Sequence, residues 1–142
     1  MQNLIETNIY EPKGKVLICG TCLPKMQPDG YTSLSADFDM VLSLCLEKEH
    51  VNMAITKICG MLSTGQITQL VFATVNNSPH CTQMHYIKRE IKRMMHNNLP
   101  PIFNFIVENN KLHLIYGETI ELSKDLVSLQ KMNQTNKEIK LT

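Results

Sequence analysis

Apolar side chains in this chain occur either in short runs or in stripes at helical spacing, and the two patterns predict different elements. Residues 15–19 (KVLIC) form a continuous apolar run that is typical of a strand buried on both faces. Residues 67–75 are rich in Val, Ile, Thr and Phe and are bounded by turn residues, which predicts another strand. Apolar residues alternate over 103–107 and 112–116 around an Asn-Asn pair, which is the pattern of a β-hairpin.

Helically spaced apolar residues predict the helices. Ser35 is a suitable N-cap for a helix in which apolar residues recur over 38–46, before a charged cluster interrupts it. A second stripe over 51–62 predicts another helix, which ends near Gly65. The earlier segment 20–33 is punctuated by Gly, Pro and Asp and is predicted to be a loop. A loop of that length is more often functional than a short one.

The clearest helix start in the sequence lies at Ser78 and Pro79. Serine favours the N-cap position, and proline at the first helical position loses no hydrogen bond. Apolar residues over 84–94 form the buried stripe of this helix. Ser123 is expected to cap a last short helix.

The order strand–helix–strand–helix–hairpin–helix predicts an α/β sandwich with a mixed, partly parallel sheet flanked by helices. We expect residues 1–142 to form a single domain, with a loosely held leader over 1–14 and a polar tail over 134–142. In such sheets ligands bind beyond the carboxyl ends of the strands. Residues that follow the predicted strands are therefore the first candidates for a site.

The composition is that of a globular chain without a strong net charge. Of its 142 residues 43% are hydrophobic, and 14 basic residues oppose 13 acidic residues. This balance gives no basic footprint for nucleic acid or for an anionic membrane. No apolar run approaches the roughly 20 residues that span a bilayer, and no signal peptide opens the chain. We therefore expect a soluble, cytoplasmic protein that binds neither nucleic acid nor membranes.

The cysteines are the strongest chemical lead. The chain has five, an odd number that argues against a secreted disulfide framework and for reduced thiols, metal ligands or redox chemistry. Cys19 and Cys22 have the C-x-x-C spacing of zinc sites, iron–sulfur sites and dithiol redox centres. Leu23 follows where attachment of c-type haem requires histidine. Alternatively, Cys19 is a buried strand residue and Cys22 is an unreactive loop thiol.

Cys81 is the best single candidate for a nucleophile. As the third residue of the predicted helix it lies near unsatisfied backbone N–H groups, which favour the thiolate over the thiol. His85 lies one helical turn further on the same side, and His80 precedes Cys81 at the helix entrance. Cysteine and histidine at this spacing can share a metal ion, or the imidazole can support the thiolate. Alternatively, Cys81 extends the apolar stripe into the core and both histidines lie on the surface.

The remaining candidates are expected to have structural roles. Cys45 and Cys59 lie on apolar helical stripes and are expected in the core. Neither of the phosphate-binding patterns GxGxxG and GxxxxGK[ST] occurs. One predicted helix carries a basic face without interleaved aromatic residues, which is typical of a solvated surface. This face consists of Lys88, Arg89, Lys92, Arg93 and His96.

The stretch from about residue 65 to residue 95 resembles a family of small bacterial and archaeal α/β proteins labelled iron–sulfur or ferredoxin-like. The matching residues are the strand LVFAT at 70–74, a short turn, Ser78, Pro79, His80 and Cys81, and then Gln83, His85 and Tyr86. The resemblance implies that Ser78, Pro79, His80, Cys81 and His85 form a motif that this chain shares with the family. It also implies a redox or cluster-associated function in anaerobic metabolism. The chain departs from the family by lacking the dense C-x-x-C-x-x-C ladder that houses a cluster by itself.

Three functions remain open on the sequence. In the first, Cys19, Cys22 and Cys81, assisted by His80 or His85, hold an iron–sulfur cluster or a zinc ion in a redox protein. In the second, Cys81 is a nucleophile for thiol or persulfide exchange, and Cys19 or Cys22 resolves the intermediate. In the third, the chain is a non-catalytic accessory module in which the cysteines only pack. A redox partner protein or a homo-oligomer is the expected partner.

Overall fold

The structure, a computed structural model, describes residues 1–135 and contains one six-stranded sheet. The strand order is β1-β3-β2-β4-β5-β6, and all neighbouring strands are parallel except β5 and β6. This architecture confirms the predicted α/β class with a mixed, partly parallel sheet. The strands are β1 (Gln2–Asn3), β2 (Gly14–Gly20), β3 (Met40–Leu44), β4 (Ile67–Val75), β5 (Ile102–Glu108) and β6 (Lys111–Ile115).

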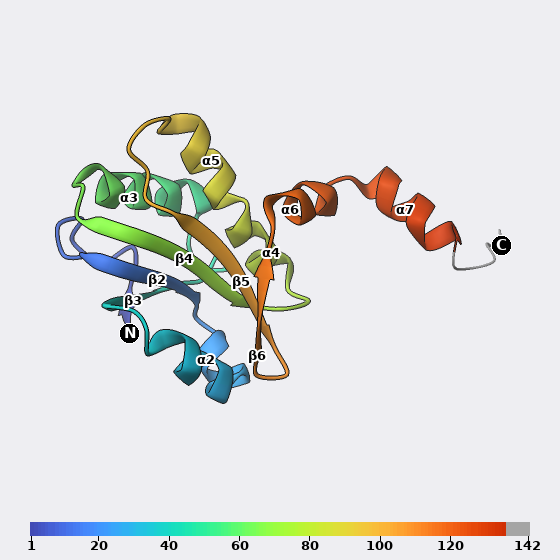
Figure 1. The fold of residues 1–142 in the computed structure, drawn as a ribbon, viewed down its shortest axis with the longest axis horizontal. Coiled ribbons are helices and arrows are strands. Elements are labelled where there is room, and N and C mark those ends of the chain that lie inside the picture. Colours follow the sequence, from blue (N-terminus) through green and yellow to red (C-terminus); the bar gives the residue numbers. More distant parts are fainter. Residues whose placement is uncertain (136–142) are drawn as a thin grey trace.

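Helices cover both faces of the sheet (Figure 1). Helices α3 and α5 pack on one face and α1 and α2 on the other, whereas α7 projects away from the sheet. Within residues 1–135, no helix is long and apolar enough to cross a bilayer. The helices are α1 (Leu23–Met26), α2 (Pro28–Ser35), α3 (Val51–Ser63), α4 (Pro79–His85), α5 (Ile87–Met94), α6 (Gly117–Ser123) and α7 (Leu126–Thr135).

The central strand β2 divides the core into two layers. Side chains alternate between the two faces of a strand, so Val16 and Ile18 pack with α3 and α5 whereas Leu17 and Cys19 pack with α1 and α2. All four side chains are buried. A strand with helices on both faces requires a continuous apolar run, and the prediction for residues 15–19 is confirmed.

Two local sequence signals are also confirmed. Ser78 is the N-cap of α4, where its Oγ accepts a hydrogen bond of 3.3 Å from the backbone N–H of Cys81, and Pro79 is the first helical residue. Asn109 and Asn110 connect β5 to β6 with φ angles of 51° and 57°. Asparagine tolerates this left-handed conformation, which the tight hairpin turn requires.

The predictions for residues 20–46 are wrong in two places. The segment predicted as a loop contains the short helices α1 and α2, each with a proline in its first turn. The helix predicted behind Ser35 is instead β3, whose run MVLSL pairs in parallel with β1 and with β2. A short apolar run fits the spacing of a buried helix as well as that of a buried strand. Here the segment forms a strand because it pairs with a strand on each side.

The first residues of the chain are held in place more firmly than a loose leader would be. Gln2–Asn3 pairs with β3, and the side chain of Leu4 is fully buried in the core layer beneath α3. At the other end, the polar tail predicted from residue 134 begins inside α7. Its remaining residues, 136–142, lie outside the described part of the chain.

The start of α7 also differs from the prediction. Ser123 ends α6 instead of capping the helix that follows it. Asp125 has the capping role, because its Oδ1 accepts a hydrogen bond of 3.1 Å from the backbone N–H of Ser128. Aspartate and serine are both good N-caps, so the sequence pattern did not separate the two positions.

Candidate functional site

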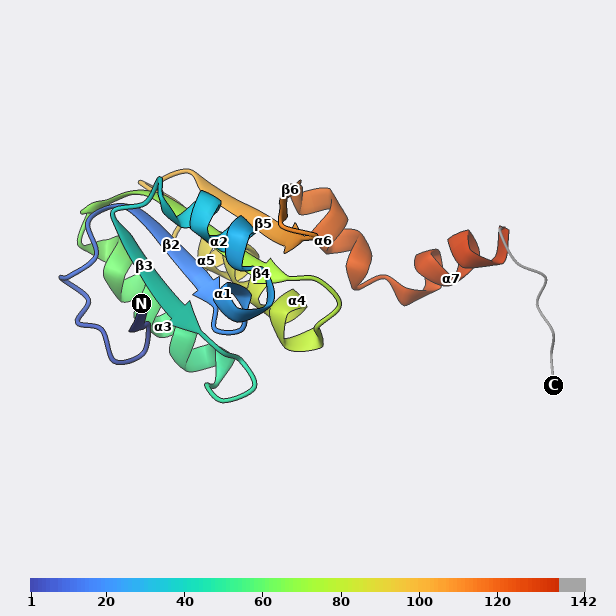
Figure 2. The same cartoon turned by 90° about the horizontal axis from the view of Figure 1, so that it is seen from below.

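The sheet has a topological switch point between β2 and β4. The chain runs from β2 to β3 on one side and then crosses to β4 on the other side of β2. The connections therefore leave the carboxyl ends of β2 and β4 in opposite directions, and ligands of open α/β sheets bind in the crevice that results. Helices α1 and α4 both lie at this end of the sheet (Figure 2).

A cleft of about 40 Å³ lies at this edge of the sheet, and we call it the cysteine cleft. Its walls come from the segments that follow β2, β3 and β4, so three separate parts of the chain meet there. Most of its apolar wall belongs to the core layer beneath α3. The polar and sulfur-bearing side chains around it include Thr21, Cys22, Cys45, Glu47, His80 and Cys81.

Three of the predicted site residues line the cysteine cleft. Cys22 is exposed at the N-terminal end of α1. His80 and Cys81 lie in the first turn of α4, with His80 exposed and Cys81 half-buried. Cys81 also packs against the core layer that contains Cys19. The helix that Ser78 caps therefore fixes one thiol in the wall of a cleft that is also lined by an exposed thiol.

The structure separates the two cysteines of the C-x-x-C motif. Cys19 is 0% exposed in β2, and its Sγ–H donates a hydrogen bond of 3.3 Å to the carbonyl oxygen of Gly20. Burial raises the pKa of Cys19 to about 12, and the neighbouring Cys81 adds to that shift. Cys19 therefore stays a protonated core thiol, while Cys22 faces solvent.

Cys45 is the site residue that the sequence reasoning missed. It directly follows β3 at the carboxyl edge of the sheet and is half-buried in the wall of the cysteine cleft. The error follows from the prediction of a helix over 38–46, because a residue at the end of a parallel strand would have been a candidate. Cys59, by contrast, packs half-buried in the core on α3, where burial raises its pKa.

His85 lies away from the cysteine cleft and faces a different cavity. It is 3% exposed, and its Nε2 shares a hydrogen bond of 2.8 Å with Oγ1 of Thr74 on β4. Burial lowers the pKa of His85, and the adjacent Asn104 partly opposes this shift. The structure therefore places His85 as a buried, neutral imidazole rather than beside Cys81.

Unfolding measurements as a function of pH test this burial. The unfolded chain binds the imidazole proton near the ordinary pKa of 6.5, whereas the folded chain binds it only at lower pH. The free energy of unfolding is expected to fall as the pH drops below about 6.5, by up to about 1.4 kcal/mol per pH unit, until the lowered pKa is reached. His85→Gln should remove this slope, and the same change at the exposed His113 should keep it. If the free energy of unfolding depends on pH in the same way in the wild type and in both variants, His85 is not the buried imidazole that causes the slope.

The described residues do not form a ready-made metal centre. Within residues 1–135, no group of three or more His, Cys, Asp or Glu side chains is arranged to hold a metal ion. Cys22, His80 and Cys81 line one cleft, but Cys19 is in the core and His85 is in another cavity. A metal bound at the cysteine cleft would require its side chains to move closer together.

A family model described as a Rossmann-like domain matches residues 12–140 of the chain. The chain belongs to this family. No curated protein and no solved structure matches it. The six-stranded sheet and its switch point agree with the Rossmann-like assignment.

The residues of this Rossmann-like domain do not fit the dinucleotide that many such folds bind. A dinucleotide site needs a glycine-rich turn after the first long strand and a helix whose N-terminus meets the pyrophosphate. Here the turn contains Gly20 alone, and the helix that follows has four residues, with Pro24 in its first turn. Cys22 occupies the place of the phosphate-binding turn.

Proposed function

We propose that this Rossmann-like domain carries out thiol–disulfide exchange at the cysteine cleft. The observation that supports this proposal is the meeting of Cys22, Cys45 and Cys81, from three chain segments, at the switch point of the sheet. Thiols on three independent segments are not required by packing, because apolar residues would fill the same wall. A crevice at the switch point is also where an open α/β sheet admits a ligand.

Cys81 is the attacking thiol in this proposal. Its thiolate attacks one sulfur of a low-molecular-mass disulfide, forms a mixed disulfide and releases the other half as a thiolate. Cys22 then attacks the Cys81 sulfur and releases the second half, which leaves a disulfide between Cys22 and Cys81. The protein loses two electrons, the substrate disulfide gains them, and the two protons of the protein thiols pass to the two released thiolates. A redox partner protein would return the disulfide to the dithiol.

The structure favours Cys22 over Cys19 as the resolving thiol. Cys22 is exposed and lines the same cleft as Cys81, so a mixed disulfide on Cys81 would lie on the side of the cleft that Cys22 shares with solvent. Cys19 is buried, and its raised pKa keeps it protonated at neutral pH. The thiolate is the nucleophile in this chemistry, and Cys19 is therefore a poor attacking group.

A trapping experiment with glutathione disulfide tests these roles. In wild-type protein the mixed disulfide should be transient, because Cys22 resolves it. In Cys22→Ser the mixed disulfide on Cys81 should accumulate to about one per chain, as measured by intact-protein mass spectrometry. Cys59→Ser, which changes a thiol outside the cleft, should behave as the wild type. If the mixed disulfide accumulates equally in the wild type and in Cys22→Ser, Cys22 is not the resolving thiol.

A zinc or iron–sulfur site is the second candidate function. It is favoured by the three cleft thiols together with His80, which form a chemically suitable ligand set. Binding would need these side chains to converge, because in residues 1–135 they form no metal-holding group. Anaerobic purification followed by zinc, iron and sulfide analysis separates the two candidates. About one metal site per chain, lost in Cys81→Ser, would favour this candidate over exchange.

A further inference from the structure

A second and larger cavity lies on the face of the sheet covered by α4 and α5. It has a volume of about 670 Å³ and is bounded by His85, α5, the β5 residue Asn104 and the start of α6. We call it the basic cavity. Cavities of this size hold small organic molecules. It shares no lining residue with the cysteine cleft.

The floor of the basic cavity is formed by two buried polar side chains. Asn104 is 0% exposed in the middle of β5, and His85 is 3% exposed. Among the described residues, neither the Asn104 amide nor Nδ1 of His85 meets the geometry of a hydrogen bond with any partner, although Asn104 lies close enough to His85 to raise its pKa. Buried polar groups are almost always paired, because an unpaired one costs free energy. Groups that face a cavity unpaired can be retained to bind a ligand.

The rim of the basic cavity is positively charged. Four cationic side chains of α5 line it, against two carboxylates of α6: Lys88, Arg89, Lys92 and Arg93, and Glu118 and Glu121. Burial and the nearby Lys92 lower the pKa of Lys88, while Glu118 raises it. Two lysines thus lie close enough to repel each other, and a bound anion would relieve that repulsion.

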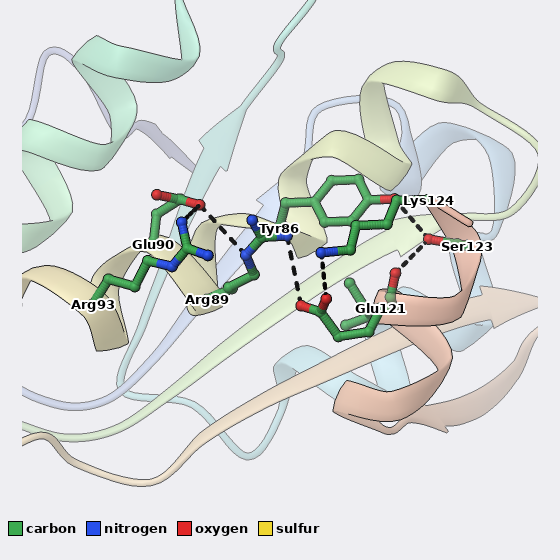
Figure 3. Close-up of polar contacts among 8 residues, drawn as sticks. Tyr86, Arg89, Glu90, Arg93, Glu121, Ser123 and Lys124 are labelled. Atoms are coloured by element: carbon green, nitrogen blue, oxygen red, sulfur yellow. Dashed lines mark hydrogen bonds and ion pairs between the residues drawn. The ribbon is translucent and has the colours of Figure 1, made fainter. Parts of the chain in front are cut away.

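Contacts from α5 and its N-cap residue Tyr86 to α6 fix the wall of the cavity (Figure 3). Oη of Tyr86 and Oγ of Ser123 share a hydrogen bond of 2.6 Å, and Nη1 of Arg89 lies 3.6 Å from Oε1 of Glu121. Glu121 also pairs with Lys124, the C-cap residue of α6, so the charge of this carboxylate is already compensated. Lys88 and Lys92 form no ion pair with any described residue, so they are available to an anion.

We propose that the basic cavity binds a small phosphate monoester, with its phosphate on Lys88 and Lys92 and a neutral polar group on Asn104 and His85. The rim supplies the positive charge that a phosphate needs. The floor supplies uncharged donors and acceptors, which suit a hydroxyl or amide group. The volume leaves room for an organic portion between the two ends. This proposal does not depend on the function proposed for the cysteine cleft.

Calorimetric titrations with AMP, adenosine and inorganic phosphate test both ends of the site. AMP should bind saturably, and adenosine and phosphate should each bind more weakly. Lys92→Glu should weaken AMP binding by about tenfold or more, the expected loss of a charged contact. Lys25→Glu, a charge reversal on the exposed α1, is the matched control and should leave binding unchanged.

Asn104→Leu separates a ligand-binding role from a structural one. The change removes unpaired polar atoms from a buried position, so the melting temperature should stay the same or rise. AMP binding should nevertheless fall to the level of inorganic phosphate. The proposal is overturned if none of the probes binds saturably, if Lys92→Glu and Lys25→Glu have equal effects, or if Asn104→Leu leaves AMP affinity intact. If a short oligouridylate binds more tightly than AMP and its binding depends strongly on salt, the basic cavity is part of a nucleic-acid surface and the proposal is overturned.

Discussion

Replacing Cys81 with serine is expected to abolish exchange with glutathione disulfide at the cysteine cleft. A serine hydroxyl is not a nucleophile toward disulfides at neutral pH, whereas a thiolate is. The rate of mixed-disulfide formation should fall by about two orders of magnitude or more, as for the removal of a nucleophile. The measurement is the second-order rate constant with glutathione disulfide, followed by mass spectrometry.

The other cysteines supply the controls for this substitution. Cys59→Ser changes a half-buried thiol on α3 and should leave the rate unchanged. Cys45→Ser changes a thiol in the same cleft and should retain most of the rate, because Cys45 has no assigned step. Cys81 is itself only half-buried, so its serine variant should remain folded. A Cys81→Ser protein that exchanges at the wild-type rate would show that the reactive thiol is elsewhere.

Replacing Gly30 with alanine is expected to lower the free energy of unfolding by about 1–3 kcal/mol, the cost of overpacking a filled site. A Cβ at this position would overlap Cγ1 of Val107 and lie 3.1 Å from Cα of Asn110. Val107 is fully buried, and Asn110 holds its left-handed turn conformation while its Oδ1 accepts a hydrogen bond from the backbone N–H of Gly30. Neither neighbour can move without disturbing the contact between α2 and the hairpin.

Gly117→Ala is the matched control for the change at Gly30. Gly117 is the first residue of α6, and a Cβ there would meet no heavy atom within 4 Å. Alanine at an unstrained helical position should be neutral or stabilise the fold by a few tenths of a kcal/mol to about 1 kcal/mol. Chemical denaturation of both variants gives the comparison. Equal stabilities would mean that α2 does not pack against the hairpin as described.

The fold was predictable where local patterns and tertiary contacts agree. The run at 15–19, the strand at 67–75 and the helix start at Ser78 are each confirmed, because a buried strand needs apolar side chains on both faces and a helix needs a cap. The run at 40–44 has apolar residues that fit a helix as well as a strand. Its structure depends on pairing with β1 and β2, which no local pattern contains.

The candidate site was predictable only in part, for the same reason. Cys22, His80 and Cys81 follow predicted strands, and the switch point brings them to one cleft. Cys45 was hidden because its strand was assigned as a helix. The spacing of Cys81 and His85 did not indicate that His85 would be buried against Thr74, since the direction of each side chain depends on the position of α4 over the sheet.

The sequence predicts a solvated surface for the basic face of α5, because no aromatic residues are interleaved with its charges. Its neighbours in the cavity are Asn104 on β5, the next element along the chain, and residues of α6, which follows two strands later. An asparagine in an alternating strand pattern gives no sign that it is fully buried and unpaired. Only the folded arrangement joins these residues into a cavity.

The disulfide formed on oxidation tests the cysteine cleft most directly. Tryptic peptide 16–25 contains both Cys19 and Cys22, and peptide 58–88 contains both Cys59 and Cys81, so fragmentation within each peptide must locate the linked sulfurs. After reaction of the reduced protein with glutathione disulfide, we expect the dominant link to join Cys22 to Cys81. A dominant link through Cys19 or Cys59, or a protein in which Cys81 remains a free thiol, would contradict exchange at this cleft.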